Sequence, residues 1–154
     1  MDIPGWRSVQ LEVLLLDVNG TLTLDGELLA GVETGLKALV GMLDVQLVSG
    51  DTFGRLDNIA AQLGVRAKRL EAGRPEAAQK ADVVRRLGAE RVVAIGNGAN
   101  DSDMLRESVL GIAVVGPEGL AGSALAAADV VLAPIHDALG LLVNSKRLMG
   151  TLRR

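Results

Sequence analysis

Polar residues stand directly after three apolar runs of this sequence, where they could do chemistry together. The first run ends in Asp17, and Asn19 and Thr21 follow in the next turn. An aspartate that closes an unbroken run of Leu and Val is typical of the carboxyl end of a buried parallel strand. Ligands of open α/β sheets bind at that edge. Asp and Asn are also common turn formers, so a plain turn remains the alternative at this point.

Similar clusters follow two later apolar runs. Their polar residues are Ser49 and Asp51 after the second run, and Asn97, Asn100, Asp101 and Asp103 after the third. Because the carboxyl ends of parallel strands share one edge, we expect these side chains to lie close together. Several carboxylates at one edge repel each other unless a cation neutralises them. Mg²⁺ prefers such hard oxygen ligands, together with water and a substrate phosphate.

Lys80 stands out on the helix expected between Pro75 and Leu87. It shares an apolar stripe with Ala77 and Val84, and a lysine in such a stripe needs a partner for its charge. The acidic edge of the sheet would supply one. The alternative is an ammonium group that extends past Val84 to water.

The composition limits the classes of protein that the chain can be. Of its 154 residues 49% are hydrophobic but only 1% are aromatic, so we expect a core of aliphatic side chains. The formal charge of −3 argues against nucleic acid as a partner, because that requires a clustered basic face. There is no cysteine for a disulfide or a thiolate metal site. Residues 1–10 lack the pattern of a secretory signal, and no apolar run could span a membrane. This predicts a cytoplasmic protein without membrane contact.

Strand and helix patterns alternate along the chain, which predicts a single α/β domain over residues 1–154. Strands are expected at 11–16, 45–48, 65–70, 91–95, 110–115 and 130–132. Helices are expected at 32–42, 53–63, 75–87, 120–127 and 139–152, and a further short helix after the third polar cluster ends at residue 105. This order favours a mainly parallel central sheet with helices on both faces. The dipeptide Asp25-Gly26 between short apolar segments predicts a two-residue hairpin turn.

The segment Gly96-Asn97-Gly98 after a strand could also indicate a dinucleotide site. The third glycine of that motif is replaced by Asp101, and acidic residues beside a pyrophosphate would repel it. The sequence also has no Gly-Lys-Ser/Thr phosphate loop. Neither nucleotide-binding motif is therefore expected.

Four segments together resemble the four motifs of the haloacid dehalogenase (HAD) superfamily. They are Asp17-Val18-Asn19-Gly20-Thr21-Leu22-Thr23, Ser49, Lys80 near the start of a helix, and Gly96-Asn97-Gly98-Ala99-Asn100-Asp101. They occur in the family's order, and the second and fourth look most like the phosphorylation domains of P-type ATPases. The resemblance implies a HAD-like Rossmannoid three-layer fold with a short β-hairpin flap, in a capless member similar to soluble P-type-ATPase-like proteins.

The resemblance also implies a role for each motif residue. Asp17 would be the nucleophile that forms an aspartyl phosphate. Ser49 and the neighbouring Gly50 would bind the transferring phosphoryl group, and Lys80 would neutralise its charge. The other substrate-binding residues would be Gly20, Thr21 and Asn100. Mg²⁺ would be held by Asp17, the backbone carbonyl of Asn19, Asn97 and Asp101.

Two positions depart from the family's pattern. Asn19 stands where the phosphatases usually have the Asp that protonates the leaving group and activates water, and an amide cannot transfer a proton. Because acid–base catalysis typically contributes about 10²–10⁴-fold, we predict slow hydrolysis of the phosphoenzyme. Asn97 stands where the family usually has a metal-ligating Asp. This predicts weaker binding of Mg²⁺, with Asp101 as the expected replacement ligand.

No sizeable insertion separates these motifs, so no cap domain is expected. The resemblance then implies a Mg²⁺-dependent phosphatase of low turnover that acts on a phosphorylated small molecule or another phosphoester. A homo-oligomer could form through the apolar flap, whose leucines are Leu22, Leu24, Leu28 and Leu29. The alternative function, favoured by Asn19 and Asn97, is a non-catalytic or regulatory protein that binds phosphate or a protein partner.

Overall fold

A central sheet organises the computed structural model, which describes residues 1–154. Its six strands are parallel and lie in the order β5-β4-β1-β6-β7-β8. In chain order they are β1 (Val13–Asp17), β4 (Asp44–Ser49), β5 (Arg66–Arg69), β6 (Val92–Gly96), β7 (Leu110–Val114) and β8 (Val130–Leu132). The predicted α/β fold with a parallel central sheet is confirmed.

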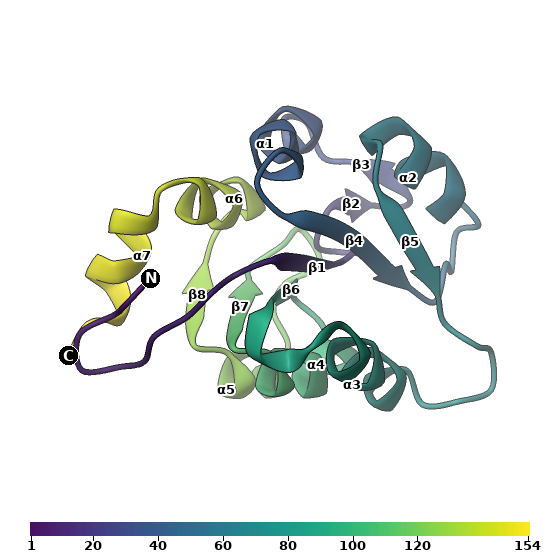
Figure 1. Cartoon of the computed structure of the whole chain (residues 1–154). Helices are drawn as coiled ribbons and strands as arrows, with labels where there is room; N and C mark the ends of the chain where they lie inside the picture. The colour runs from purple at the N-terminus through teal and green to yellow at the C-terminus, as the bar shows by residue number, and fades with distance from the viewer.

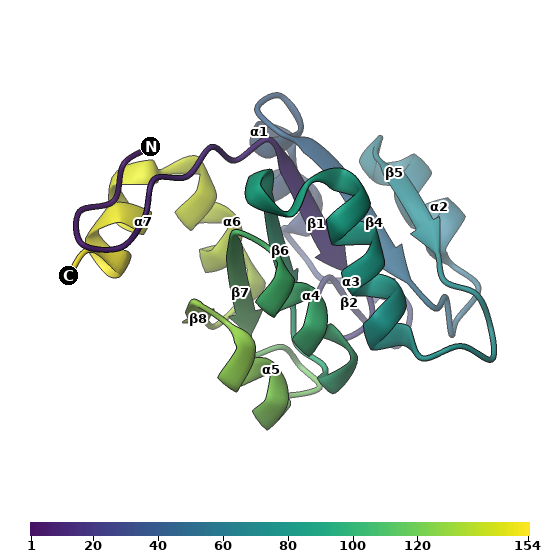
Figure 2. The same cartoon turned by 60° about the horizontal axis from the view of Figure 1, so that its bottom comes forward.

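Helices cover both faces of this sheet (Figures 1 and 2). One face carries α1 (Val32–Val40), α2 (Leu56–Leu63) and α6 (Ile135–Val143), and the other carries α3 (Glu76–Leu87), α4 (Ser102–Glu107) and α5 (Gly122–Ala127). The last helix, α7 (Ser145–Leu152), lies beside the N-terminal segment, where Arg154 N donates to Pro4 O at 3.0 Å. None of the helices combines the length and the apolar character that a bilayer crossing needs.

Alternate side chains of β1 belong to two separate parts of the core. Leu14 and Leu16 pack in the large cluster under α1, α2 and α6, whereas Val13 and Leu15 pack in the smaller cluster under α3, α4 and α5. All the residues of β1 are buried. A strand that is covered on both faces needs a continuous apolar run, which explains the uninterrupted leucines before Asp17.

The strand order reverses at β1. Its neighbours are β4 on one side and β6 on the other, so the chain first extends the sheet one way and then crosses to extend it the other way. In sheets of this kind, ligands bind in the crevice at the carboxyl ends of the strands where the order reverses. Asp17 is the last residue of β1, and the topology therefore places it at that crevice.

The hairpin expected after β1 is present. The strands β2 (Thr23–Leu24) and β3 (Glu27–Leu28) pair antiparallel. Between them, Asp25 and Gly26 have positive φ angles of 51° and 82°, as a two-residue turn of type I′ requires.

Most of the flap's leucines pack against the chain's own core. Leu22 is fully buried, and Leu28 and Leu29 pack against the large cluster. Of the four, Leu24 is the one that is largely exposed. Among these leucines, Leu24 is the one that a second copy of the chain could contact, and the homo-oligomer stays a prediction.

The predicted closing helix at 139–152 is wrong, because the structure has two helices there. The first, α6, begins directly after Pro134, and α7 begins after Asn144. Asn144 has φ −113° and ψ 87°, which lies outside the helical region. Asn and Ser side chains compete for the backbone groups of a helix, and this favours a break at Asn144-Ser145. The other predicted helices and strands are present, with shifted ends.

Gly111 lets α4 pack directly on β7, and a side chain there should disturb the fold. A Cβ at residue 111 would clash with the backbone carbonyl oxygen of Leu105, which cannot move without shifting the helix. We expect Gly111→Ala to lower the free energy of unfolding by about 1–3 kcal/mol, as overpacking does, and urea denaturation measures this loss. Gly122→Ala is the control, because no atom lies within 4 Å of a Cβ at that position. Equal effects of the two changes would contradict this account.

Candidate active site

A buried lysine links two buried carboxylates at the carboxyl edge of the sheet. Lys80 Nζ lies 2.7 Å from Asp17 Oδ1 and 2.7 Å from Asp101 Oδ1. The exposed fractions of the side chains are 1% for Lys80, 7% for Asp17 and 0% for Asp101. We call these three residues the buried triad. The expectation that the acidic edge provides partners for Lys80 is confirmed, and its ammonium group does not extend to water.

Three separate elements bring the buried triad together. Asp17 ends β1, Lys80 lies in the second turn of α3, and Asp101 ends the short 3₁₀ helix η2 (Ala99–Asp101) after β6. Lys80 shares the buried face of α3 with Val84. The apolar stripe that anchors α3 to the sheet therefore also directs the lysine towards the end of β1.

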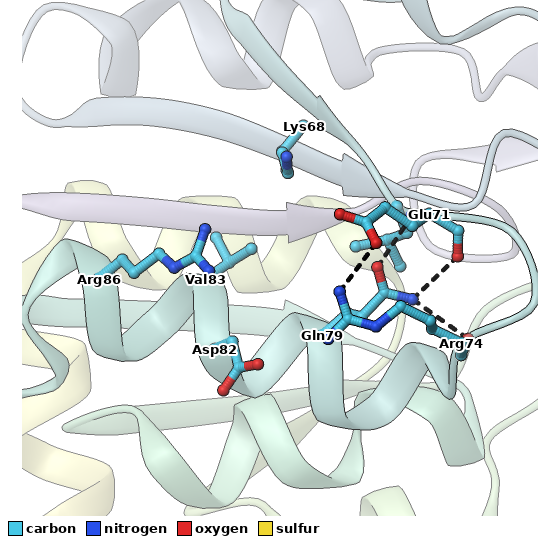
Figure 3. A pocket seen from close by; sticks show the side chains of 8 residues that line it. Lys68, Glu71, Arg74, Gln79, Asp82, Val83 and Arg86 are labelled. Carbon is cyan, nitrogen blue, oxygen red and sulfur yellow. Dashed lines mark hydrogen bonds and ion pairs between the residues drawn. The ribbon is translucent and has the colours of Figure 1, made fainter.

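Gln79 fixes the start of α3 beside a small pocket of about 40 Å³ (Figure 3). Its amide nitrogen donates to the carbonyl oxygens of Glu71 and Arg74 at 3.0 and 3.1 Å, and its amide oxygen accepts from Glu71 N at 2.8 Å. These bonds tie the turn before α3 to the helix and so help to hold Lys80 in place. Arg74 pairs with Glu71 at 2.8 Å, and it does not contact the buried triad.

The buried triad carries one net negative charge, because two carboxylates share one ammonium group. Burial raises the pKa of Asp17 to about 6 against the attraction of Lys80, and repulsion from Asp101 adds to the rise. Burial alone would lower the pKa of Lys80, but the two carboxylates outweigh it and raise that pKa above its ordinary value. Lys80 therefore stays charged at neutral pH, and a further cation near Asp17 would be favourable.

The Thr21 hydroxyl lies between two acceptors at the end of β1. Its Oγ1 is 2.9 Å from Asp17 Oδ2 and 3.0 Å from Asn97 Oδ1. Asn97 Nδ2 donates to Gly119 O at 3.2 Å, and this bond turns Oδ1 towards Thr21. Because one hydroxyl has one proton, it cannot satisfy both oxygens fully. The charged Asp17 oxygen and the neutral Asn97 oxygen therefore share the one proton of the Thr21 hydroxyl.

Both carboxylate oxygens of Asp101 are engaged within the protein. Oδ1 accepts from Lys80, and Oδ2 accepts from the backbone N–H groups of Asn97 and Gly98 at 3.0 and 2.8 Å. Asp101 is fully buried and does not line the neighbouring cleft. Its position suits the support of Lys80 and of the turn at 97–98, and it differs from the metal-ligand position expected from the sequence.

A polar cleft of about 190 Å³ opens beside the buried triad, and none of its lining residues is hydrophobic. They are Asp17, Asn19, Ser49, Gly50, Thr52, Glu76, Lys80, Asn97, Gly98, Asn100 and Glu118. Most residues expected at the site from the sequence are thus brought together here. Gly20 and Thr21 are buried next to the cleft rather than lining it.

Ser49 presents a free hydroxyl proton at the cleft. Its Oγ accepts from Asp51 N at 2.9 Å, and the protein offers no acceptor for its proton. Asp51 itself turns away from the cleft, because its carboxylate accepts from Leu56 N at 2.9 Å and pairs with Arg69. Ser49 can therefore donate a hydrogen bond to a ligand in the cleft.

Three lining residues were not singled out from the sequence, namely Thr52, Glu76 and Glu118. Glu76 precedes Lys80 by four residues, so the two share a face of α3, and this spacing could have revealed it. Glu76 Oε2 accepts from Asn100 Nδ2 at 2.6 Å. Glu118 follows β7, whose carboxyl end lies at the same sheet edge as that of β1, and its place after a strand is the signal for it.

The oxygen donors at the cleft are of mixed type. No group of three or more acidic, histidine or cysteine side chains could hold a metal ion by itself. The cleft instead offers the Asp17 carboxylate, the Asn97 amide and the backbone carbonyl of Asn19, which accepts no backbone hydrogen bond. These are hard donors, the kind that Mg²⁺ takes in combination with water.

Lys80→Met should destabilise the protein by about 3–5 kcal/mol at neutral pH, because it leaves two buried carboxylates without a cation. The loss should shrink as the pH falls. Burial already raises the pKa of Asp17, and loss of the Lys80 charge raises this pKa further. The folded variant therefore binds more protons than the unfolded chain and gains stability on acidification. Urea denaturation of both proteins at neutral and mildly acidic pH measures the difference.

Lys37→Met is the matched control for this change. Lys37 pairs with Glu33 at 3.7 Å on the surface of α1, and its side chain is 72% exposed. Loss of such an exposed pair should cost less than about 1 kcal/mol. A loss for Lys80→Met that does not vary with pH would show that the packing of the lysine chain, not its charge, stabilises the fold.

Solved structures with a similar fold include two phosphatases and an ion pump. A 3-deoxy-D-manno-octulosonate 8-phosphate phosphatase from Moraxella catarrhalis, in complex with magnesium, phosphate and KDO, gives a TM-score of 0.70 at 19% identity over 93% of this chain and 94% of that chain. The cobalt-bound deoxy-D-mannose-octulosonate 8-phosphate phosphatase from Haemophilus influenzae gives 0.65 at 22% identity over 90% and 91%. A zinc-transporting PIB-type ATPase in its E2.Pi state gives 0.66 at 24% identity over 80% of this chain and 20% of that chain.

Sequence comparison adds the family. An uncharacterized protein of Methanocaldococcus jannaschii is 44% identical over 64 residues, which are 42% of this chain and 69% of that protein. The family of haloacid dehalogenase-like hydrolases matches residues 2–108, which include Ser49 and the whole buried triad. The family predicted from four short motifs is confirmed: this chain belongs to the haloacid dehalogenase-like hydrolases.

Proposed function

We propose that this hydrolase is a Mg²⁺-dependent phosphatase in which Asp17 is the nucleophile. The observation that supports this most is the pairing of Asp17 with the buried, permanently charged Lys80 at a wholly polar cleft. A cation beside a carboxylate allows a phosphate group to approach a nucleophile of the same charge. The phosphatase from Moraxella catarrhalis, whose fold is similar, was solved with magnesium and phosphate.

In the proposed reaction a carboxylate oxygen of Asp17 attacks the phosphorus atom. The new bond joins Asp17 to phosphorus, while the bond from phosphorus to the leaving oxygen breaks and that oxygen takes a proton from water. Ser49 donates a hydrogen bond to the phosphoryl group, and Lys80 offsets its negative charge. Water then attacks phosphorus and loses a proton to solvent, which releases phosphate and restores the carboxylate.

The remaining residues of the site receive supporting roles. Gly50 and Asn100 lie at the cleft and would contact the phosphoryl group. Thr21, from behind the cleft, orients Asp17, and Gly20 shapes the loop between them. The chain between β1 and β4 holds only the flap and α1, so no cap is inserted there. The proposed substrate is a phosphorylated small molecule or another phosphoester.

Mg²⁺ would neutralise charge on Asp17 and on the phosphate when bound. The proposed protein ligands are Asp17, the Asn19 carbonyl and Asn97, whose oxygens fit the preference of the ion for hard donors. Asp101 is left out of this set, because it is fully buried and does not line the cleft. We assign it the positioning of Lys80.

Slow turnover is part of the proposal. Asn19 lies at the cleft, where it can form hydrogen bonds but cannot deliver or remove a proton. Both the departure of the leaving group and the attack of water would then proceed without acid–base help, worth about 10²–10⁴-fold.

Asp17→Asn should abolish Mg²⁺-dependent hydrolysis of p-nitrophenyl phosphate, since an amide cannot act as the nucleophile. Asp82→Asn is the control, because Asp82 pairs with Arg85 at 2.8 Å on the outer side of α3, and it should retain the wild-type rate. Steady-state release of p-nitrophenol by the purified full chain is the measurement. If wild type and Asp17→Asn share one background rate, the proposal fails for this substrate class.

Asn19→Asp should raise the turnover number by about 10²-fold or more, because it restores a group that can transfer protons. The matched control is Asn58→Asp, which makes the same chemical change on the exposed surface of α2. The pH–rate profile of Asn19→Asp should also gain a limb that wild type lacks. An unchanged rate and profile would show that acid–base help is not what limits this enzyme.

A second candidate function is a non-catalytic protein that binds phosphate or a protein partner. Asn19 and Asn97 favour it, since both remove groups that other family members use. The double variant Asn19→Asp/Asn97→Asp separates the two functions. A large gain in the rate of hydrolysis supports a phosphatase whose activity is reduced by the two asparagines, whereas no gain supports the binding protein.

A further inference from the structure

We propose that Glu118 is a ligand of the Mg²⁺ ion and supplies the negative charge that Asn97 lacks. This inference rests on the proposed function, because it concerns the same metal site. It assigns a role to a residue that lies outside the four sequence motifs and reaches the cleft from the turn after β7.

The turn that carries Glu118 is tied to the loop that contains Asn97. Gly119 N donates to Gly116 O at 2.9 Å, so Pro117 and Glu118 form the tip of a tight turn. Asn97 Nδ2 donates to Gly119 O at 3.2 Å, and Ala121 N donates to Asn97 O at 2.9 Å. These bonds fix the backbone next to Glu118 relative to the loop that contains Asn97.

Glu118 and Asn97 meet over Gly20. A Cβ on Gly20 would collide with Glu118 Oε2 and would stand 2.8 Å from Asn97 Nδ2. Gly20 has a φ of 77°, which glycine adopts readily, and its missing side chain leaves room for the carboxylate. The Glu118 carboxylate therefore lies beside the residue that replaces the usual metal-ligating aspartate.

The two glutamates at the rim of the cleft, Glu76 and Glu118, differ in their hydrogen bonds. Glu76 Oε2 accepts a hydrogen bond from Asn100 Nδ2 at 2.6 Å. The Glu118 side chain has no hydrogen bond or ion pair within the protein, although it lines the cleft together with Asp17. Glu118 is exposed to solvent at the mouth of the cleft, and a cation there would offset the repulsion between its carboxylate and the net negative buried triad.

The resulting donor set suits Mg²⁺. Glu118 and Asp17 would provide two carboxylates, and the Asn19 carbonyl and the Asn97 amide two neutral oxygens. Mg²⁺ in proteins usually takes one or two carboxylates and completes its shell with water and substrate phosphate. With Asp17 as the only carboxylate, the site would have a weaker hold on the ion.

Titration calorimetry of Mg²⁺ into the full chain, with inorganic phosphate present, tests the assignment. Glu118→Gln should weaken Mg²⁺ binding by about 10–100-fold, the range typical for loss of a group that supports a metal site. The matched control is Glu76→Gln, which removes the same charge from the other side of the cleft and should change the affinity far less. Thermal unfolding of each variant without Mg²⁺ checks that the fold is retained.

A rescue experiment makes the assignment specific. Asn97→Asp in the Glu118→Gln background should restore Mg²⁺ affinity, because it returns a carboxylate to the adjacent position. Wild-type affinity in Glu118→Gln would overturn the inference and leave the proposed function standing. Unchanged affinity with a lost limb of the pH–rate profile would overturn it in favour of proton transfer by Glu118. If wild type binds no Mg²⁺, the metal site of the proposed function fails, and this inference fails with it.

Discussion

The site depends on one ammonium group that is buried between two carboxylates. Removing three charged groups from water is expensive, and well-packed apolar side chains would often be as stable in their place. A purely structural need therefore explains the buried triad poorly. What the triad provides is a fixed positive charge at Asp17 in a region of low dielectric, where electrostatic interactions are stronger than in water. The cost is understandable if that charge acts on an anion that enters the cleft.

The topology explains why distant segments can share this charge. Asp17, Ser49 and Asp101 each follow or end an element at the carboxyl edge of the parallel sheet, and β1 lies at the reversal of strand order. Lys80 comes from α3, which packs on the sheet through the same stripe that contains Val84. The sheet thus fixes the spacing of the acidic groups, and the helix delivers the cation between them.

The parts of the site that depend on local pattern could be predicted from the sequence. The unbroken leucines before Asp17 predicted a buried strand with an acidic end, and the stripe around Lys80 predicted a buried cation that needs acidic partners. The role of Asp101 was harder to predict, because the backbone path of η2 decides whether its carboxylate faces the cleft or Lys80. Glu118 was missed because its place depends on a turn that packs against Gly20 from far along the chain. The break at Asn144 was missed because the apolar spacing continues across it.

The two asparagines of the site are accompanied by a shift of negative charge from its centre to the rim of the cleft. The number of carboxylates changes less than their position. Relative to the usual family pattern, Asn19 and Asn97 remove two carboxylates from the centre of the site. Glu76 and Glu118 place two carboxylates at the rim of the same cleft. In the proposed site the Glu118 carboxylate would attract the cation, whereas Asn19, where the family usually has its acid–base Asp, cannot transfer a proton. The proposed reaction would thereby separate metal binding from acid–base catalysis, as expected of a phosphatase that keeps its metal site and turns over slowly.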